Sequence, residues 1–270
     1  MTTDREWGDR ASDIARIEAA LDAAAAVLED FTPGRIDATF KSGDDPLTEA
    51  DLAVDHALRE HLPLAGEGWL SEETGDSHER LQRSRVWVVD PIDGTNNFIH
   101  GLPFYNISIA YREKGATKYG VVYAPALGDM YYSEAGQGSF KNNSRLKVSN
   151  NKRLDKCIGI SGFPALRAGI KPNNVDLFPL IILKLQSVRI HGASALDFCF
   201  VAEGRCDLLW YFNPNPWDTA AGELILAEAG GKVSDFQGGR EHELKKQIAG
   251  SNGFVHDEFI SLLESCSGAY

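Results

Sequence analysis

Two aspartates that stand three positions apart mark the most informative segment of this 270-residue chain. Asp90 and Asp93 follow the largely apolar run Arg85–Val89, which is typical of a buried strand with function at its carboxyl end. Their oxygen atoms suit a hard divalent cation such as Mg²⁺. Gly94 and Thr95 come next and can offer backbone N–H groups to a phosphate oxygen. The first hypothesis is therefore metal-assisted phosphate chemistry.

A second segment, Pro216–Gly222, contributes one more acidic candidate, Asp218. Two roles fit this aspartate: a cap at the start of the following helix, or an additional oxygen ligand. The small residues at 220–222 would let that helix approach another element closely. Turn chemistry alone explains one Asp-Pro or Asp-Gly pair, but it does not explain several such features behind one apolar strand.

The motifs DPIDGT at Asp90–Thr95 and WDTAAG at Trp217–Gly222 resemble the two signatures of the inositol monophosphatase family. This family belongs to the Mg²⁺-dependent, Li⁺-sensitive phosphatases, with fructose-1,6-bisphosphatases and bisphosphate nucleotidases. The resemblance extends from about Ile14 to Gly231. It implies a layered α+β / α/β sandwich (αβαβα) and a homodimer.

The resemblance also implies two or three Mg²⁺ ions. A first site would comprise Glu72, Asp90 and the carbonyl of Ile92, and a second would bridge Asp90, Asp93 and Asp218. The expected reaction is in-line attack of water on phosphorus without a covalent enzyme intermediate.

Three further residues flank these positions. Asp51 matches the acid that orients the Thr95 hydroxyl in the family, and the alternative is an exposed helix acid. Glu72 together with the Thr95–Asp51 pair would orient or deprotonate the water, and Glu73 competes with Glu72 for its role. Lys41 lies in a predicted mobile loop over residues 31–46, where the family often has a lysine near a third metal; a function and an ordinary surface role fit it equally.

The expected substrate contacts include two departures from the family pattern. The set comprises Asp93, Gly94, Thr95, Gly192, Ser194, Tyr211 and Asn215. Typical inositol monophosphatases carry a glutamate and often a histidine where this chain has Tyr211 and Asn215. A phenol or an amide does not accept from two hydroxyls as a carboxylate does. Gly192 has an alternative role as a turn, and His191 is interpreted as a packed strand residue.

Several functions stay open at this point. The favoured activity is hydrolysis of inositol 1-phosphate to inositol and phosphate, with a possible broad sugar-phosphate specificity. Residues 95–101 resemble the inositol branch, whereas residues 68–74 resemble bacterial bisphosphate nucleotidases. A 3′(2′),5′-bisphosphate nucleotidase and a fructose-1,6-bisphosphatase are therefore alternatives. A catalytically silent binding or regulatory module is the alternative of another class.

Hydrophobic periodicity indicates which elements would position these residues. Helices are expected at residues 12–31, 49–62, 194–203 and 218–229. Strands are expected at residues 85–89, 105–112, 118–124, 129–134, 157–161, 187–191 and 207–212. The runs between 105 and 134 predict an antiparallel meander. A boundary near Asn150 would separate an α+β subdomain, 1–150, with most metal ligands from an α/β subdomain, 151–270, with Asp218 and the substrate pocket.

Composition limits the kinds of partner that the chain can bind. The chain has 39 acidic and 27 basic residues, a net charge of −12, which argues against nucleic acid or an anionic membrane as the main partner. No apolar run approaches the roughly 20 residues that a bilayer requires. Four scattered cysteines are expected to be reduced thiols, which favours the cytoplasm. A small phosphorylated substrate could still bind, because two or three Mg²⁺ ions would reverse the local charge.

Overall fold

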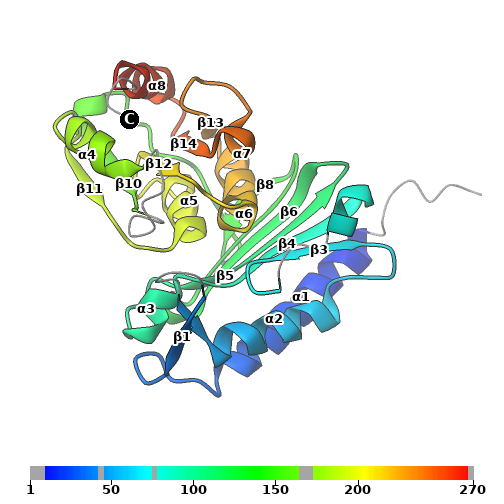
Figure 1. The fold of residues 1–270 in the computed structure, drawn as a ribbon. Helices are drawn as coiled ribbons and strands as arrows, with labels where there is room; N and C mark the ends of the chain where they lie inside the picture. The colour runs from blue at the N-terminus through cyan, green and yellow to red at the C-terminus, as the bar shows by residue number, and fades with distance from the viewer. Residues whose placement is uncertain (1–9, 42–45, 75–77, 164–172, 267–270) are drawn as a thin grey trace, which may run out of the picture.

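The computed structural model describes residues 10–41, 46–74, 78–163 and 173–266 (Figure 1). Its larger sheet has seven strands in the order β3-β4-β5-β6-β7-β8-β9. These are β3 (Gly68–Ser71), β4 (Arg85–Asp93), β5 (Asn106–Glu113), β6 (Ala116–Ala124), β7 (Asp129–Glu134), β8 (Gly138–Lys141) and β9 (Ser144–Arg145). β3 and β4 are parallel and all later neighbours are antiparallel, which confirms the expected meander.

Helices cover both faces of this sheet. Helices α1 (Arg10–Leu28) and α2 (Glu49–His61) pack on one face, and α5 (Ser194–Ala202) and α6 (Pro216–Glu228) pack on the other. Successive side chains of a strand point to opposite faces. Trp87 and Val89 of β4 therefore join the core with α1 and α2, whereas Val88 joins the core with α5 and α6. This burial on both sides explains why β4 reads as a continuous apolar run.

The smaller sheet has five strands in the order β11-β10-β12-β14-β13. These are β10 (Ile158–Ser161), β11 (Ser187–Arg189), β12 (Leu208–Phe212), β13 (Lys232–Ser234) and β14 (Gln247–Ser251). Leu209 and Tyr211 of β12 face α5 and α6, and Leu208 and Trp210 face a separate core with α4 (Asn174–Ile182) and α8 (His256–Ser265). The layers therefore run helix, sheet, helix, sheet, helix, which confirms the expected αβαβα sandwich (Figure 1).

Short elements complete the described chain. They are β1 (Ala38–Phe40), β2 (Pro46–Thr48), α3 (Thr95–Ile99), α7 (His242–Lys245) and the 3₁₀ turns η1 (His78–Gln82), η2 (Pro125–Leu127) and η3 (Leu154–Lys156). The expectation of an irregular loop over 31–46 was wrong in part, because β1 and β2 form an antiparallel pair. Strands of three residues are too short to show a period of two among Gly, Pro and charged residues. Residues 42–45 lie outside the described part of the chain.

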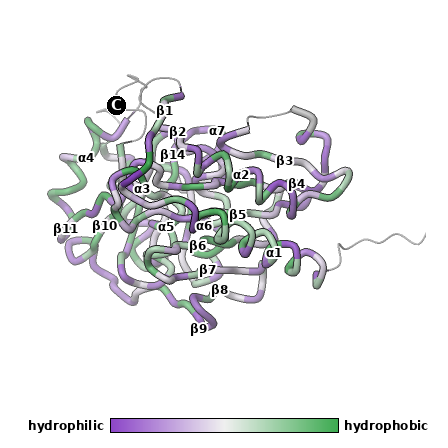
Figure 2. The backbone as a smooth tube through the Cα atoms, turned by 90° about the horizontal axis from the view of Figure 1, so that it is seen from below, coloured by the Kyte–Doolittle hydropathy of each residue, from purple (hydrophilic) through white to green (hydrophobic). Residues whose placement is uncertain are grey.

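The expectations on membrane helices, cysteines and the subdomain boundary have separate outcomes. Within the described ranges, no helix combines the length and apolar character that crossing a bilayer demands. All four cysteines are free and buried. Hydrophilic stretches lie mainly at the periphery of the molecule, as around β9 (Figure 2). The division near Asn150 stays a prediction, and the core around α5 and α6 receives side chains from both sheets.

Candidate active site

Most of the predicted site residues line one cavity of about 340 Å³ between the two sheets. Its walls are formed by Pro46, Glu72, Ile92, Asp93, Gly94, Thr95, Asn96, Gly162, Phe163, Ile190, Gly192, Ala193, Ser194, Tyr211, Pro214 and Asp218. Residues separated by more than a hundred positions in the chain therefore meet at one place.

The carboxyl end of β4 places two aspartates at this cavity. The pairing of β4 with β5 shifts register between Asp90 and Asp93, so the chain turns out of the ladder there. Gly94 follows with φ +93°, and a Cβ atom at this position would lie 2.6 Å from the Phe104 carbonyl oxygen. Only glycine fits this turn, because an L side chain would be strained and would collide with the backbone. Thr95 then begins α3.

Three acidic side chains converge closely enough to hold a metal ion. One oxygen atom each of Glu72, Asp90 and Asp218 lies within 4.8 Å of the other two. Asp90 is 2% exposed, and among the described residues its Oδ1 atom has no hydrogen-bond donor. A buried carboxylate oxygen without a donor is costly, and coordination of a cation would satisfy it. The donor set therefore fits a hard divalent cation.

Burial and mutual repulsion disturb the titration of these acids. Burial, followed by the charges of neighbouring acids, raises the pKa of Asp90 well above its usual range. Burial also raises the pKa of Asp218, with Glu72 and Asp93 adding to the shift. A cation bound among them would favour their ionised forms.

Asp218 is not the N-cap of its helix. Asn215 holds that position, and its backbone N–H donates to the Asp218 carboxylate at 2.7 Å in the first turn of α6. Asp218 is therefore the N3 residue of α6, and the alternative in which it is the N-cap is wrong. One oxygen of its carboxylate is tied to the helix start, which orients the side chain toward Glu72 and Asp90.

Asp93 is held by Asn106 and by two backbone N–H groups, and of these residues the sequence had singled out only Ser194, as a substrate contact. Asn106 Nδ2 donates to it at 2.9 Å, and the N–H groups of Ser194 and Ala195 donate at 3.1 and 2.8 Å. Burial raises the pKa of Asp93 to about 7, although these donors oppose the shift. Asn106 lies on the neighbouring strand β5 and the N–H groups begin α5, so only the tertiary fold brings them to Asp93.

Asp51 is buried rather than an exposed helix acid. It accepts from the N–H and hydroxyl of Thr48 in a capping box at the start of α2. Its other oxygen lies 3.0 Å from the Thr95 hydroxyl, which also lies 2.9 Å from the Ile92 carbonyl. The exposed alternative was wrong, since α2 packs its Asp51 side against the large sheet.

Lys41 reaches the same region. Its Nζ atom lies 2.9 Å from Glu72 Oε1 and 2.7 Å from a Glu73 carboxylate oxygen. Although burial alone would lower the pKa of Lys41, the two glutamates raise it. Glu73 pairs with Lys41 outside the cluster of three acids, whereas Glu72 belongs to that cluster.

The four remaining candidates for substrate contact differ in whether they line the cavity. Gly192, Ser194 and Tyr211 line the cavity, and Gly192 has φ +80°. Asn215 caps α6 and is not among the lining residues, so its substrate contact stays a prediction. His191 packs beside Phe104, with ring centroids 4.9 Å apart.

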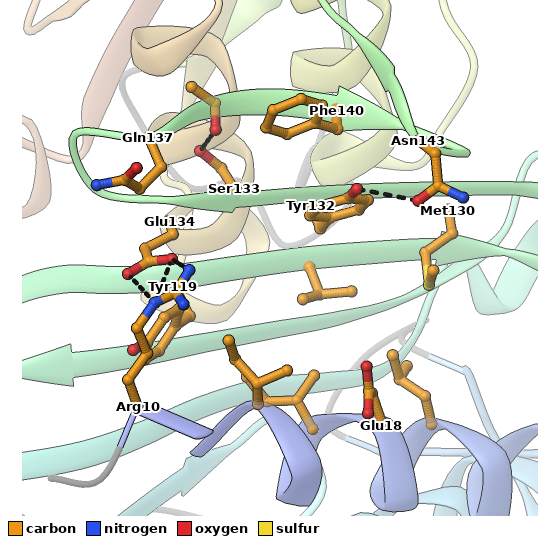
Figure 3. A pocket seen from close by; sticks show the side chains of 15 residues that line it. Arg10, Glu18, Tyr119, Met130, Tyr132, Ser133, Glu134, Gln137, Phe140 and Asn143 are labelled. Carbon is orange, nitrogen blue, oxygen red and sulfur yellow. Dashed lines mark hydrogen bonds and ion pairs between the residues drawn. The ribbon is translucent and has the colours of Figure 1, made fainter. Parts of the chain in front are cut away.

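Another cavity, of about 460 Å³, lies between α1 and strands β6–β8, away from these residues (Figure 3). The Arg10–Glu134 ion pair lies at one end of it, and Tyr132 donates to Asn143 at 3.2 Å at the other. Its lining is largely apolar and includes none of the predicted site residues. The chemistry expected from the sequence therefore belongs to the cavity at the end of β4.

Comparisons with known proteins show the family of the chain and its fold. A model of the Inositol monophosphatase family matches residues 10–267. The fructose-1,6-bisphosphatase/inositol-1-monophosphatase of Thermotoga maritima is 39% identical over 245 residues, covering 85% of this chain and 88% of that protein. The Nus factor SuhB of Pasteurella multocida is 34% identical over 230 residues, covering 84% and 86%. The solved Thermotoga maritima IMPase superposes with a TM-score of 0.82 at 34% identity, covering 95% of this chain and 97% of that one.

Proposed function

The chain belongs to the inositol monophosphatase family of phosphatases, and we propose that it catalyses Mg²⁺-dependent hydrolysis of a phosphate monoester, with inositol 1-phosphate as the first candidate. One observation carries the proposal. Glu72, Asp90 and Asp218 converge within 4.8 Å at the end of the cavity where Gly94 and Thr95 begin α3.

The proposed metal arrangement gives each of these acidic residues a role as a metal ligand. Glu72, Asp90 and the Ile92 carbonyl would hold one Mg²⁺, and Asp90, Asp93 and Asp218 would hold a second; a third ion is part of the same proposal. The support is the unpaired Oδ1 of Asp90 and the all-oxygen donor set. Such ions supply Lewis acidity toward phosphate oxygens and lower the pKa of water.

The protein groups then orient the reactants. The Thr95 hydroxyl has one hydrogen, and donating it to Asp51 leaves a lone pair that can accept a hydrogen bond from one O–H of the attacking water, the bond whose proton is then lost. Glu72 is the proposed partner that takes up that proton. The water oxygen bonds to phosphorus while the bond from phosphorus to the leaving-group oxygen breaks. That oxygen takes a proton from solvent water and leaves as an alcohol, and Glu72 returns its proton to solvent.

Backbone donors complete the phosphate end. The N–H groups of Gly94 and Thr95 stand at the start of α3 beside Asp93 and are proposed to donate to phosphate oxygens. Gly192 and Ser194, which line the same cavity, are proposed to contact the leaving group. Substitution of Gly94 would displace both donors, because the turn requires its positive φ.

A phosphate-release assay with Mg²⁺ tests the proposal, using inositol 1-phosphate, fructose 1,6-bisphosphate and adenosine 3′,5′-bisphosphate, each with and without Li⁺. We expect release from inositol 1-phosphate and inhibition by Li⁺. The Asp93→Asn variant should lose at least about a hundredfold in kcat, whereas the exposed control Asp155→Asn should keep its activity. Preference for a bisphosphate would favour the nucleotidase or fructose-1,6-bisphosphatase alternative, and no release from any substrate would favour a silent binding module.

We further propose a homodimer in a reducing compartment, the cytoplasm. The four free, buried cysteines support the compartment. Exposed apolar side chains along and just after α4 support a second copy as partner, among them Val175, Leu180, Ile182 and Leu183. Light scattering of the purified protein tests the dimer. A relative named as a Nus factor leaves a nucleic-acid-associated role open to test, and the net charge of −12 does not favour direct binding.

A further inference from the structure

The cavity of about 460 Å³ between α1 and strands β6–β8 takes no part in the proposed catalysis, since it shares no lining residue with the active-site cavity. Ile14, Ile17 and Leu21 of α1 form one wall, and residues of the three strands form most of the other (Figure 3). Small-molecule sites usually have volumes of roughly 300–1,000 Å³. An apolar molecule that filled this cavity would remove its lining from water, which is favourable. The cavity therefore has the size and the lining of a small-molecule site.

Aromatic rings contribute to the wall on the strand side. Val121, Tyr132 and Phe140 lie directly opposite one another on β6, β7 and β8, so their side chains share the face toward α1. The rings of Tyr132 and Phe140 are stacked, with centroids 5.4 Å apart and an angle of 17° between their planes. The Tyr132 hydroxyl donates to Asn143 at 3.2 Å, which holds the ring at its far end (Figure 3). The aromatic wall is therefore fixed before any ligand arrives.

One charge in this cavity is left without a partner. The charged lining residues are Arg10, Glu18 and Glu134. Arg10 and Glu134 form an ion pair and neutralise each other. Glu18 projects from α1 into the space between the helix and the strands, and its side chain pairs with no other described residue (Figure 3). The described lining therefore carries one negative charge beside aromatic and aliphatic surface.

We propose that this cavity is a ligand-binding site, additional to the active site, for an organic monocation: an amine that carries an apolar ring or chain. The ammonium group is attracted by the Glu18 carboxylate and by the π-electrons of the aromatic wall. The apolar part of the ligand lies against Ile14, Leu21 and Val121. Because Glu18 is exposed, its ion pair with the ligand is weak, and the rings and apolar contacts supply most of the affinity.

A pair of probes that differ only in charge tests the proposal. 4-Phenylbutylamine is protonated at pH 7, as a lysine side chain is, and 4-phenylbutan-1-ol has the same ring and chain without the charge. Isothermal titration calorimetry measures both dissociation constants with Mg²⁺ in excess, so that Glu72, Asp90 and Asp218 are not left as a rival cation site. We expect the amine to bind about tenfold more tightly than the alcohol. Equal affinities, or no binding of the amine at millimolar concentration, would overturn the proposal.

Variants show whether the amine binds in this cavity. Glu18→Gln and Tyr132→Leu should each reduce the preference for the amine about threefold, because each removes one of its two attractions. Tyr132→Phe keeps the ring and should keep the preference. The matched control is Asp22→Asn, which removes an exposed acid of the same helix that does not line the cavity.

The preference for the amine should be the same in Asp22→Asn as in the wild type. An equal loss of preference in Asp22→Asn and Glu18→Gln would mean that the amine responds only to the overall charge of α1, and it would overturn the proposal. An unchanged preference in both Glu18→Gln and Tyr132→Leu would place the amine elsewhere, with the same consequence. If Tyr132→Leu does not fold, Glu18→Gln carries the test, because the exposed Glu18 is not part of the core.

Discussion

The Thr95 hydroxyl donates to Asp51 Oδ1 at 3.0 Å, across 44 positions of sequence. The bond links the start of α3 to a carboxylate that caps α2. Asp51 accepts from Thr48 on its other oxygen, so it is fixed before any substrate arrives. The link is therefore fixed in advance, as its proposed role of orienting the attacking water requires.

Breaking this link should slow turnover while leaving the fold intact. We expect Thr95→Ala to lower kcat about a hundredfold, since misplacement of the attacking water by about 1 Å can cost that factor. Thr95→Ser retains the hydroxyl and should retain most activity. Steady-state kinetics at saturating Mg²⁺ measures both variants. A Thr95→Ala enzyme within about twofold of wild type would exclude the proposed role of the hydroxyl.

Removing one of the crowded acids should stabilise the protein without metal. In Asp90→Asn, we expect the free energy of unfolding in EDTA to rise by about 1 kcal/mol, because repulsion with Glu72 and Asp218 is relieved. The same variant should lose the rise in Tm that Mg²⁺ gives the wild type. Thermal melts with EDTA and with Mg²⁺ measure both effects. An equal Mg²⁺-induced rise in Tm in both proteins would place the ion elsewhere.

The buried His256 should make stability depend on pH. Its ring lies between Ser234 and Ser251, and burial, with Lys232, lowers its pKa to about 4. His256 in the unfolded chain therefore binds a proton near pH 6.5, whereas His256 in the folded chain binds it only near pH 4. The contribution of the neutral His256 to the free energy of unfolding is complete above pH 6.5. It is lost as the pH falls toward 4, by about 3 kcal/mol in total.

Urea denaturation of wild type and His256→Gln between pH 4.5 and 7.5 isolates this contribution. The difference in unfolding free energy between the two proteins should grow with pH up to about 6.5 and then level off. The comparison cancels the acids of the active site, whose raised pKa values act in the opposite direction. A difference that does not change with pH would mean that His256 titrates normally in the folded protein.

Two glycines with similar φ values should respond differently to alanine. Gly115→Ala, at φ +81° with open space around it, should cost roughly 1 kcal/mol from backbone strain alone. Gly94→Ala has the same strain and adds a contact of 2.6 Å with the Phe104 carbonyl, so it should cost more and abolish activity. Chemical denaturation and kcat measure the pair. Equal losses of stability would show that the Phe104 backbone moves aside readily.

Local sequence was sufficient for the elements that carry the chemistry. A period of 3.6 predicted α2, and β-rich runs separated by turn residues predicted the meander β5–β7, because both signals lie within short stretches of sequence. The residue types of the Asp90–Thr95 segment predicted a turn there, because few sequences are compatible with that backbone conformation. Strands of three residues such as β1 and β2 have too few positions to reveal a period, so they were missed.

Sequence by itself determined which residue types this protein brings to a phosphate: acids at the end of an apolar strand, a glycine turn and a second acidic helix start. Only the tertiary structure decided how those acids are held. Asn106 and the N–H groups of α5 fix Asp93, and Asp197 accepts the hydroxyl hydrogen of Tyr211. Hydrogen bonds between residues far apart in the chain leave no periodic trace in sequence, because they depend on how whole layers pack.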